Sequence, residues 1–178
     1  MQEGGTALVQ AAYANRVKAC ELLLENGADI EAVTEAKRTS LMIACERGNT
    51  EVVDLLLRKG AEVNKQDIYG YTALMLAAQS NAGECCQKLV EYGADTEIKS
   101  YDDNNLGPET PIQIAARVAS PDAARVLCEA GCDLKLLNKY NYTVENLCQS
   151  ARNKKLSHAD ETEDIIIDEI LKREEEDG

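Results

Sequence analysis

The sequence predicts an all-α fold, a solenoid of stacked helical hairpins, and three observations support this prediction. A threonine-led apolar segment recurs as TALVQAA from Thr6, TSLMIAC from Thr39, TALMLAA from Thr72 and TPIQIAA from Thr110. These threonines are 33, 33 and 38 residues apart, and a weaker copy, TVENLC, begins at Thr143 after 33 more. A second apolar segment that stops at glycine follows each of the first four copies. Self-similarity at such a period is typical of repeat architectures.

The first helix of each period is expected to begin after its threonine. Threonine is a good N-cap, and Pro111 takes the first helical position, where its missing NH does no harm. Small residues recur in register and allow neighbouring helices to approach closely: Ala11, Ala12, Ala44, Cys45, Ala77, Ala78, Ala115 and Ala116. Asn15, Gly48 and Asn81 follow at one phase, and these residue types tolerate a left-handed turn.

The second helix carries larger apolar residues and is expected to end at a left-handed glycine cap. The glycines are Gly27, Gly60, Gly93 and Gly131. An acidic residue two positions later opens an extended, hairpin-like link to the next threonine, and Gly4 and Gly70 mark its turn in two copies. Helices of about eight to ten residues are marginal alone in water, so stacking has to stabilise them.

These features together resemble the ankyrin repeat family, in the period, the threonine-led segments and the Gly-Ala-Asp endings at Gly27 and Gly93. The resemblance implies an array over residues 1–152 and a linker, capping helix and acidic tail over 153–178. The repeats are expected at about 1–33, 34–66, 67–104 and 105–137, with a degenerate fifth at 138–152.

The sequence departs from the family pattern in several places. The usual histidine, three residues after the threonine, is replaced by Val9, Met42, Met75 and Gln113. Apolar packing is therefore expected in place of its buried polar contact. Glu145 stands where the leucine of the fifth copy belongs, so either the register shifts by one residue or this helix is partly exposed. Gln10 suits an end repeat whose outer face meets water.

The C-terminal segment breaks the repeat. Asp160 and Glu163 have capping-box spacing, and one helical stripe is expected to hold Ile166, Ile167, Ile170 and Leu171. From Ala159 onward there are ten acidic and two basic residues. We interpret this segment as a capping helix that shields the last repeat and ends in a solvated tail; the alternative is a separate partner-binding helix.

Composition limits the classes of partner. The 178 residues include no Phe and no Trp, so aliphatic, alanine and cysteine side chains must fill the core. No apolar run is long enough to span a membrane and no secretory leader opens the chain, so a cytoplasmic location is expected, with a nuclear or cytoskeleton-associated one as the alternative. The formal charge of −13 disfavours binding to nucleic acid or anionic lipid. Protein partners are therefore expected.

No set of catalytic residues is recognisable. The one histidine, His158, stands in a polar linker, and neither a phosphate-binding loop nor a metalloprotease motif occurs. We therefore expect no enzyme activity, small-molecule substrate or cofactor. The seven cysteines lack paired CxxC spacing. Cys85 with Cys86, and Cys128 with Cys132, have spacings that could hold a metal or oxidise, but their phase matches core positions, so packing is favoured over metal binding.

The resemblance implies that residues flanking the hairpin turns and ending the first helices line a concave, partner-binding face. The candidates are Tyr13, Arg38, Arg47, Ile68, Tyr69, Tyr71, Tyr101, Arg117, Lys139, Tyr140 and Tyr142. None of the seven tyrosines is expected at a stacking position, and Tyr and Arg are enriched in interface hot spots. Alternatively, tyrosine simply suits a hairpin strand.

The insertion KSYDDNNLGPET from Lys99 predicts a longer finger that is either a contact surface or a tolerated insertion, and Tyr101 at its base favours contact. The predicted function is a non-catalytic protein–protein interaction module. The alternatives are a structural subunit of a larger cytoskeletal or regulatory assembly, or a small ankyrin-type inhibitor of an enzyme.

Overall fold

The computed structural model of the chain describes residues 6–101 and 107–176. Within these ranges the chain forms ten α-helices and no strand, which confirms the all-α prediction. The helices are α1 (Ala7–Tyr13), α2 (Val17–Glu25), α3 (Ser40–Glu46), α4 (Thr50–Arg58), α5 (Ala73–Gln79), α6 (Gly83–Glu91), α7 (Pro111–Val118), α8 (Pro121–Glu129), α9 (Val144–Asn153) and α10 (Ala159–Glu176). None of these described helices could cross a membrane. The turn expected at Gly4 lies outside the described residues.

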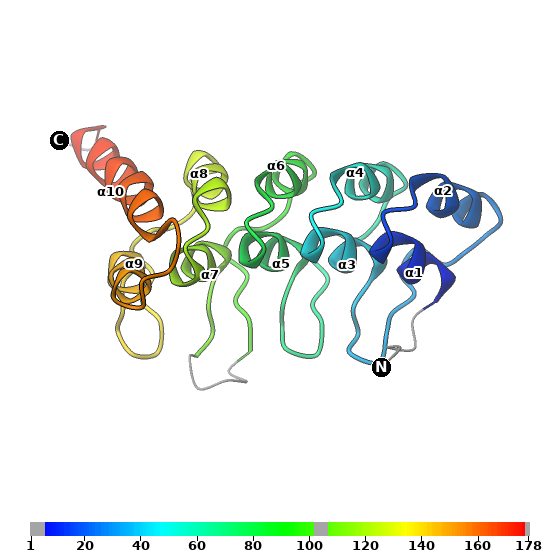
Figure 1. Cartoon of the computed structure of the whole chain (residues 1–178), viewed down its shortest axis with the longest axis horizontal. Helices are drawn as coiled ribbons and strands as arrows, with labels where there is room; N and C mark the ends of the chain where they lie inside the picture. The colour runs from blue at the N-terminus through cyan, green and yellow to red at the C-terminus, as the bar shows by residue number, and fades with distance from the viewer. Residues whose placement is uncertain (1–5, 102–106, 177–178) are drawn as a thin grey trace.

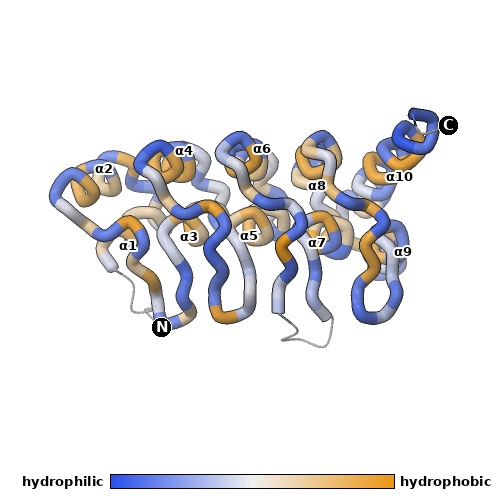
Figure 2. Tube along the Cα trace, turned by 180° about the vertical axis from the view of Figure 1, so that it is seen from behind, coloured by the Kyte–Doolittle hydropathy of each residue, from blue (hydrophilic) through white to orange (hydrophobic). Residues whose placement is uncertain are grey.

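The helices form two layers. Each odd-numbered helix packs on the next odd-numbered one, and α2, α4, α6 and α8 pack in the same way. The extended links project from the odd-numbered layer to one side of the molecule (Figure 1). Hydrophobic colour gathers in the helices, whereas the far end of α10 is hydrophilic (Figure 2).

The helix starts follow the threonine prediction. The hydroxyl oxygens of Thr39, Thr72 and Thr143 accept hydrogen bonds from the backbone N of the third helical residue at 3.2–3.3 Å, and Thr6 does so at 3.4 Å. At Thr110 the backbone N instead donates to Oε1 of Gln113 at 3.0 Å. The helices begin at these residues because each cap satisfies NH groups that have no partner within the helix.

The predicted left-handed positions also adopt positive φ. Asn15, Gly48 and Asn81 have φ of 53°, 67° and 52° between the paired helices. The four glycines that follow the second helices have φ between 80° and 88°. Asparagine at this turn also joins neighbouring pairs, since Nδ2 of Asn49 donates to the carbonyl of Ala12 at 2.8 Å.

The interior is aliphatic and thin. Leu56, Leu74 and Leu89 are fully buried, and the small residues Ala44 and Ala77 are fully buried between odd-numbered helices. Alanine at these positions lets the helix backbones approach closely, and the aliphatic side chains of the second helices fill the space between the layers.

Two sequence expectations need correction or resolution here. The expectation of apolar packing is wrong for Gln113. Its buried side chain accepts from the backbone N of Thr110 and donates from Nε2 to the carbonyl of Leu136 at 2.9 Å. In α9 the register does not shift, because Thr143 caps it as in the other copies. Glu145 is exposed, so the second alternative, a partly exposed helix, is the correct one.

Helix α10 takes the place of a second helix beside α8, in the even-numbered layer (Figure 1), and it packs against α8 and α9. The capping interpretation is confirmed. The predicted apolar stripe is only half right, because Ile166 is fully buried whereas Ile167 and Leu171 are 37% and 53% exposed. Thr162 occupies the buried face instead. The division of the chain after residue 152 stays a prediction.

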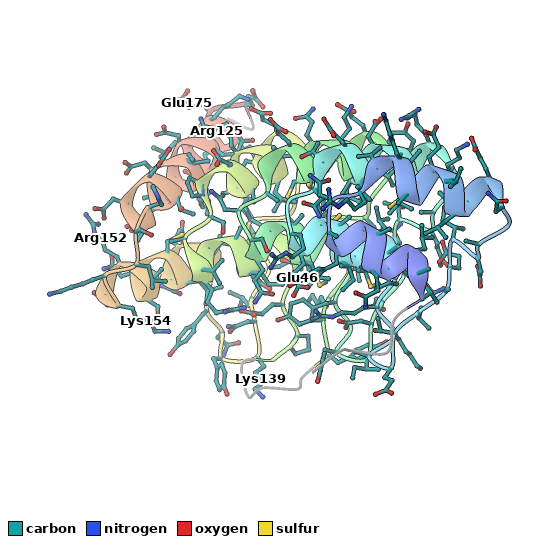
Figure 3. The ribbon with its side chains drawn as sticks, turned by 45° about the vertical axis from the view of Figure 1, so that its right-hand side comes forward. Glu46, Arg125, Lys139, Arg152, Lys154 and Glu175 are labelled. Carbon is teal, nitrogen blue, oxygen red and sulfur yellow. The ribbon has the colours of Figure 1, made fainter. Side chains whose placement is uncertain are left out.

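Ion pairs join α10 to α9, and hydrogen bonds join it to the end of α8. Instead of forming a capping box, Asp160 and Glu163 bind the guanidinium of Arg152 on α9 at 2.7 and 3.2 Å. Figure 3 shows Arg152 at the end where α9 and α10 meet. On α10, Arg173 donates to the carbonyls of Cys128 and Cys132 at 2.9 and 2.7 Å. These carbonyls lie at and just beyond the C-terminus of α8, where carbonyl groups lack helical partners.

Replacing Arg173 by Met should lower the free energy of unfolding by about 1–3 kcal/mol, because two half-buried carbonyls lose a charged donor. Urea denaturation followed by circular dichroism measures this loss. Arg125→Met is the matched control, since Arg125 meets Glu161 of α10 only at 3.8 Å and in solvent. Its effect should stay within about 0.5 kcal/mol. Equal losses in the two variants would show that the carbonyl contacts contribute nothing.

Candidate protein-binding surface

In the link between α4 and α5, one buried carboxylate accepts hydrogen bonds from two backbone NH groups of the turn. Oδ1 of Asp67 accepts hydrogen bonds from the backbone N of Tyr69 at 2.8 Å and of Tyr71 at 2.9 Å. Gly70 turns the chain between them with φ of 77°. The turn therefore has a fixed backbone, and its side chains are free to point outward.

The link between α8 and α9 has the same design with a neutral residue. Oδ1 of Asn138 accepts from the backbone N of Tyr140 at 2.9 Å and of Tyr142 at 3.1 Å, and Asn141 makes the left-handed turn. The two tyrosine rings lie 6.1 Å apart, centroid to centroid. A carboxylate and an amide oxygen thus perform the same structural task.

Neighbouring links are bonded to one another. The backbone N of Ile68 donates to the carbonyl of Ala36 at 3.1 Å, and the backbone N of Tyr101 donates to the carbonyl of Tyr69 at 2.8 Å. Gly70 is required at this approach, because a Cβ there would lie 2.5 Å from the backbone N of Tyr101. The first three links therefore form one connected edge.

Most of the predicted aromatic candidates are exposed on this side. The exposed fraction is between 43% and 53% for Tyr13, Tyr69, Tyr101, Tyr140 and Tyr142. Tyr71 differs, because it is half-buried and packs against the core, although it lies on a link and not at a stacking position. Tyr92 is exposed at the C-terminal cap of α6 and belongs to the other layer.

We define the hairpin face as the exposed candidates at the link tips together with those at the ends of α1 and α3. Its members are Tyr13, Arg47, Ile68, Tyr69, Tyr101, Lys139, Tyr140 and Tyr142. Two cations stand over rings on it: the Arg47 guanidinium is 4.7 Å from the Tyr13 centroid, and the Lys139 ammonium is 5.4 Å from that of Tyr140. Figure 3 shows Lys139 at the tip of its link, on the opposite side from Arg125 and Glu175.

The other two arginine candidates have local carboxylate partners. Arg38 pairs with Glu46 at 3.0 Å and with the buried carboxylate of Asp67 at 3.3 Å. Arg117 pairs with Glu109 at 3.0 Å. Both guanidiniums are about four-fifths buried, so these pairs brace the links and leave little free charge for a partner.

The four links share a signal that the sequence prediction missed. A short side chain with an acceptor oxygen stands at one repeat phase: Thr34, Asp67, Ser100 and Asn138. Thr34 Oγ1 accepts from the backbone N of Arg38 at 3.2 Å, and Ser100 Oγ from that of Glu109 at 3.1 Å. These residues share a position in the repeat, but they are four different residue types, so a search for a recurring residue does not find them.

One groove lies away from the hairpin face. This groove of about 780 Å³ is lined by residues of α6 and α8, including Lys88, Glu91 and Arg125. None of the predicted site residues lines it, so it offers no support for the sequence-based candidates.

The cysteines are buried free thiols, and the described residues hold no group of three His, Cys, Asp or Glu suited to a metal ion. Burial raises the pKa of the Cys45 and Cys86 thiols well above the ordinary value of 9.0. Burial likewise raises the pKa of Cys148 to about 12. Thiols held neutral in this way are poor nucleophiles and poor metal ligands. The imidazole of His158 is exposed and 3.5 Å from Glu161.

Comparison with known proteins agrees with this geometry. A family model of ankyrin repeats in three copies matches residues 8–100, which is more than half of the chain. The chain belongs to the ankyrin repeat family. Ankyrin repeats are generally protein–protein interaction modules and are typically non-catalytic. A search of curated proteins found no match. In the structure the helix pairs continue beyond residue 100, through α7, α8 and α9.

Asp67→Ala should lower the free energy of unfolding by about 2–4 kcal/mol, because two backbone NH groups and the Arg38 guanidinium lose their acceptor. Asp67→Asn should cost less, about 1 kcal/mol, because Asn138 shows that an amide oxygen can close the same turn. Chemical denaturation of both variants measures the difference. Equal losses would mean that turn closure is not the stabilising element.

Raising the pH above about 9 should destabilise the protein through Cys148. The folded pKa of about 12 exceeds the ordinary value of 9.0, so the stabilising contribution is complete below pH 9 and is lost as the pH rises toward 12. One thiol lowers the free energy of unfolding by at most about 1.4 kcal/mol per pH unit in this range. Comparing wild type with Cys148→Ala by denaturation across this range isolates the contribution. An identical pH dependence in both proteins would contradict it.

Proposed function

We propose that this chain is a non-catalytic module that binds a protein partner through the hairpin face. The observation that supports this most directly is the row of exposed tyrosines at Tyr69, Tyr101, Tyr140 and Tyr142. Asp67 and Asn138 fix the backbone at Tyr69, Tyr140 and Tyr142, and the backbone N of Tyr101 donates to the carbonyl of Tyr69. The core needs none of these four rings.

Tyrosine suits recognition for a physical reason. Its ring brings a large apolar area and a polar tip, and it loses little rotamer freedom on binding. The closing bonds of Asp67 and Asn138 hold the backbone beneath the rings in place before a partner arrives. A preorganised surface loses less conformational entropy on association than a flexible one.

The charges on this side favour a partner segment that carries acidic groups beside apolar ones. Lys37, Arg47 and Lys99 are exposed on the links and at the end of α3, whereas Arg38 and Arg117 are compensated locally. The chain as a whole carries −13, so these exposed cations, with Glu35 exposed among them, make this surface less acidic than the chain as a whole. Complementary potentials of this kind steer encounter and fix orientation more than they add affinity. Asp102 and Asp103 lie outside the described residues.

Replacing Tyr69, Tyr140 and Tyr142 together by Ala should weaken partner capture at least about tenfold, because hot-spot aromatics dominate binding energy. The measurement is quantitative recovery of partners from an extract of the protein's own source on immobilised protein. Tyr92→Ala is the matched control, since Tyr92 is 42% exposed but lies off the hairpin face. Full retention of partners by the triple variant, with unfolding unchanged, would refute the proposal.

A further inference from the structure

The helix pair α1–α2 forms one end of the stack (Figure 1) and has a neighbouring pair on one side only. Its outward positions can be identified by comparison with α3 and α4, one period later, where a neighbour covers them. There Ile43, Val52 and Leu55 are 5%, 0% and 2% exposed. Their counterparts Gln10, Ala19 and Leu22 are all exposed, and Leu22 is 62% exposed.

The opposite end of the odd-numbered layer is different in chemistry. The outward positions of α9 hold Glu145, Asn146 and Gln149, all exposed. Outer faces of terminal repeats are usually polar in this way, which keeps the array from stacking on other molecules. At the α1–α2 end of the described stack the exposed positions Leu22 and Ala19 are apolar, although Gln10 is polar; in the even-numbered layer the opposite end likewise exposes Leu171 on α10.

The charges beside Leu22 are arranged so that the face complements itself. Lys18 lies four residues before Leu22 and Glu25 three residues after it, along one exposed stripe of α2. Neither side chain makes an ion pair with any other described residue of the chain. If a second α2 packs antiparallel across Leu22, each Lys18 meets the Glu25 of the other copy. A parallel arrangement would oppose like charges.

We propose that the face formed by Ala7, Gln10, Ala19 and Leu22 is a two-fold interaction surface for a second copy of this chain. A two-fold interface presents the same patch on both subunits, and the Lys18–Leu22–Glu25 stripe has the required self-complementarity. Ala7, exposed where its counterpart Ser40 is fully buried, and Ala19 permit close approach of the helices. Gln10 can both donate and accept, so its amide need not be left unpaired at such an interface. This surface is independent of the hairpin face.

Sedimentation equilibrium of the whole chain tests the proposal. The wild type should show a reversible monomer–dimer equilibrium, and Leu22→Asp should be monomeric over the same concentrations. Leu171→Asp is the matched control, because Leu171 is 53% exposed at the opposite end of the stack and should leave the dimer unchanged. Circular dichroism verifies that both variants fold.

Charge exchange supplies a sharper test of the antiparallel arrangement. Lys18→Glu and Glu25→Lys should each weaken the dimer about tenfold, and the double variant should restore it, because both ion pairs re-form with reversed sign. Glu51→Lys, one period later on α4, should have no effect. Monomers at every concentration up to about 100 µM, in the range where weak interfaces still associate, would overturn the proposal. So would a dimer that survives Leu22→Asp or single reversals that are not rescued by the double variant.

Discussion

Short helices that cannot stand alone are the constraint on which this structure depends. The first nine helices span only seven to ten residues, below the length at which an isolated helix is stable in water. Their stability comes from burying one face against the next pair, so each interface supports its neighbours on both sides. The ends of the stack then become special positions. At one end α10 and Arg173 cover α8, whereas at the other end of the described stack Leu22 is exposed.

The same constraint separates packing from recognition. Residues that face a neighbouring pair, such as Ala44 and Leu74, are fixed by the stacking distance. Residues at the link tips, such as Tyr69 and Tyr140, contribute little to burial, so stacking does not determine which side chains stand there. Tyr71 marks the boundary between the two classes, because it lies on a link and still packs against the core.

Much of the fold could be predicted from the sequence because its signals are periodic. The threonine caps, the glycine ends and the left-handed asparagines recur at one spacing, and each has a single local cause. What could not be predicted depends on contacts between distant residues. Gln113 has a buried polar role because Leu136 offers a carbonyl, and the apolar side of α10 turns toward Thr162 and Ile166 because α8 and α9 lie there. In the candidate site, exposure of the tyrosines followed from their phase, whereas the pairing of Arg38 with Asp67 did not.

The acceptor residues beneath the links have a consequence for how such a protein changes over time. Thr34, Asp67, Ser100 and Asn138 differ chemically, yet each closes its own link with a single oxygen atom. The residues at the link tips can therefore be substituted without a change in the backbone of the links or in the packing of the helices. If the hairpin face binds a partner as proposed, a few substitutions at the link tips would change the binding preference in evolution, and a designer could retarget the protein in the same way.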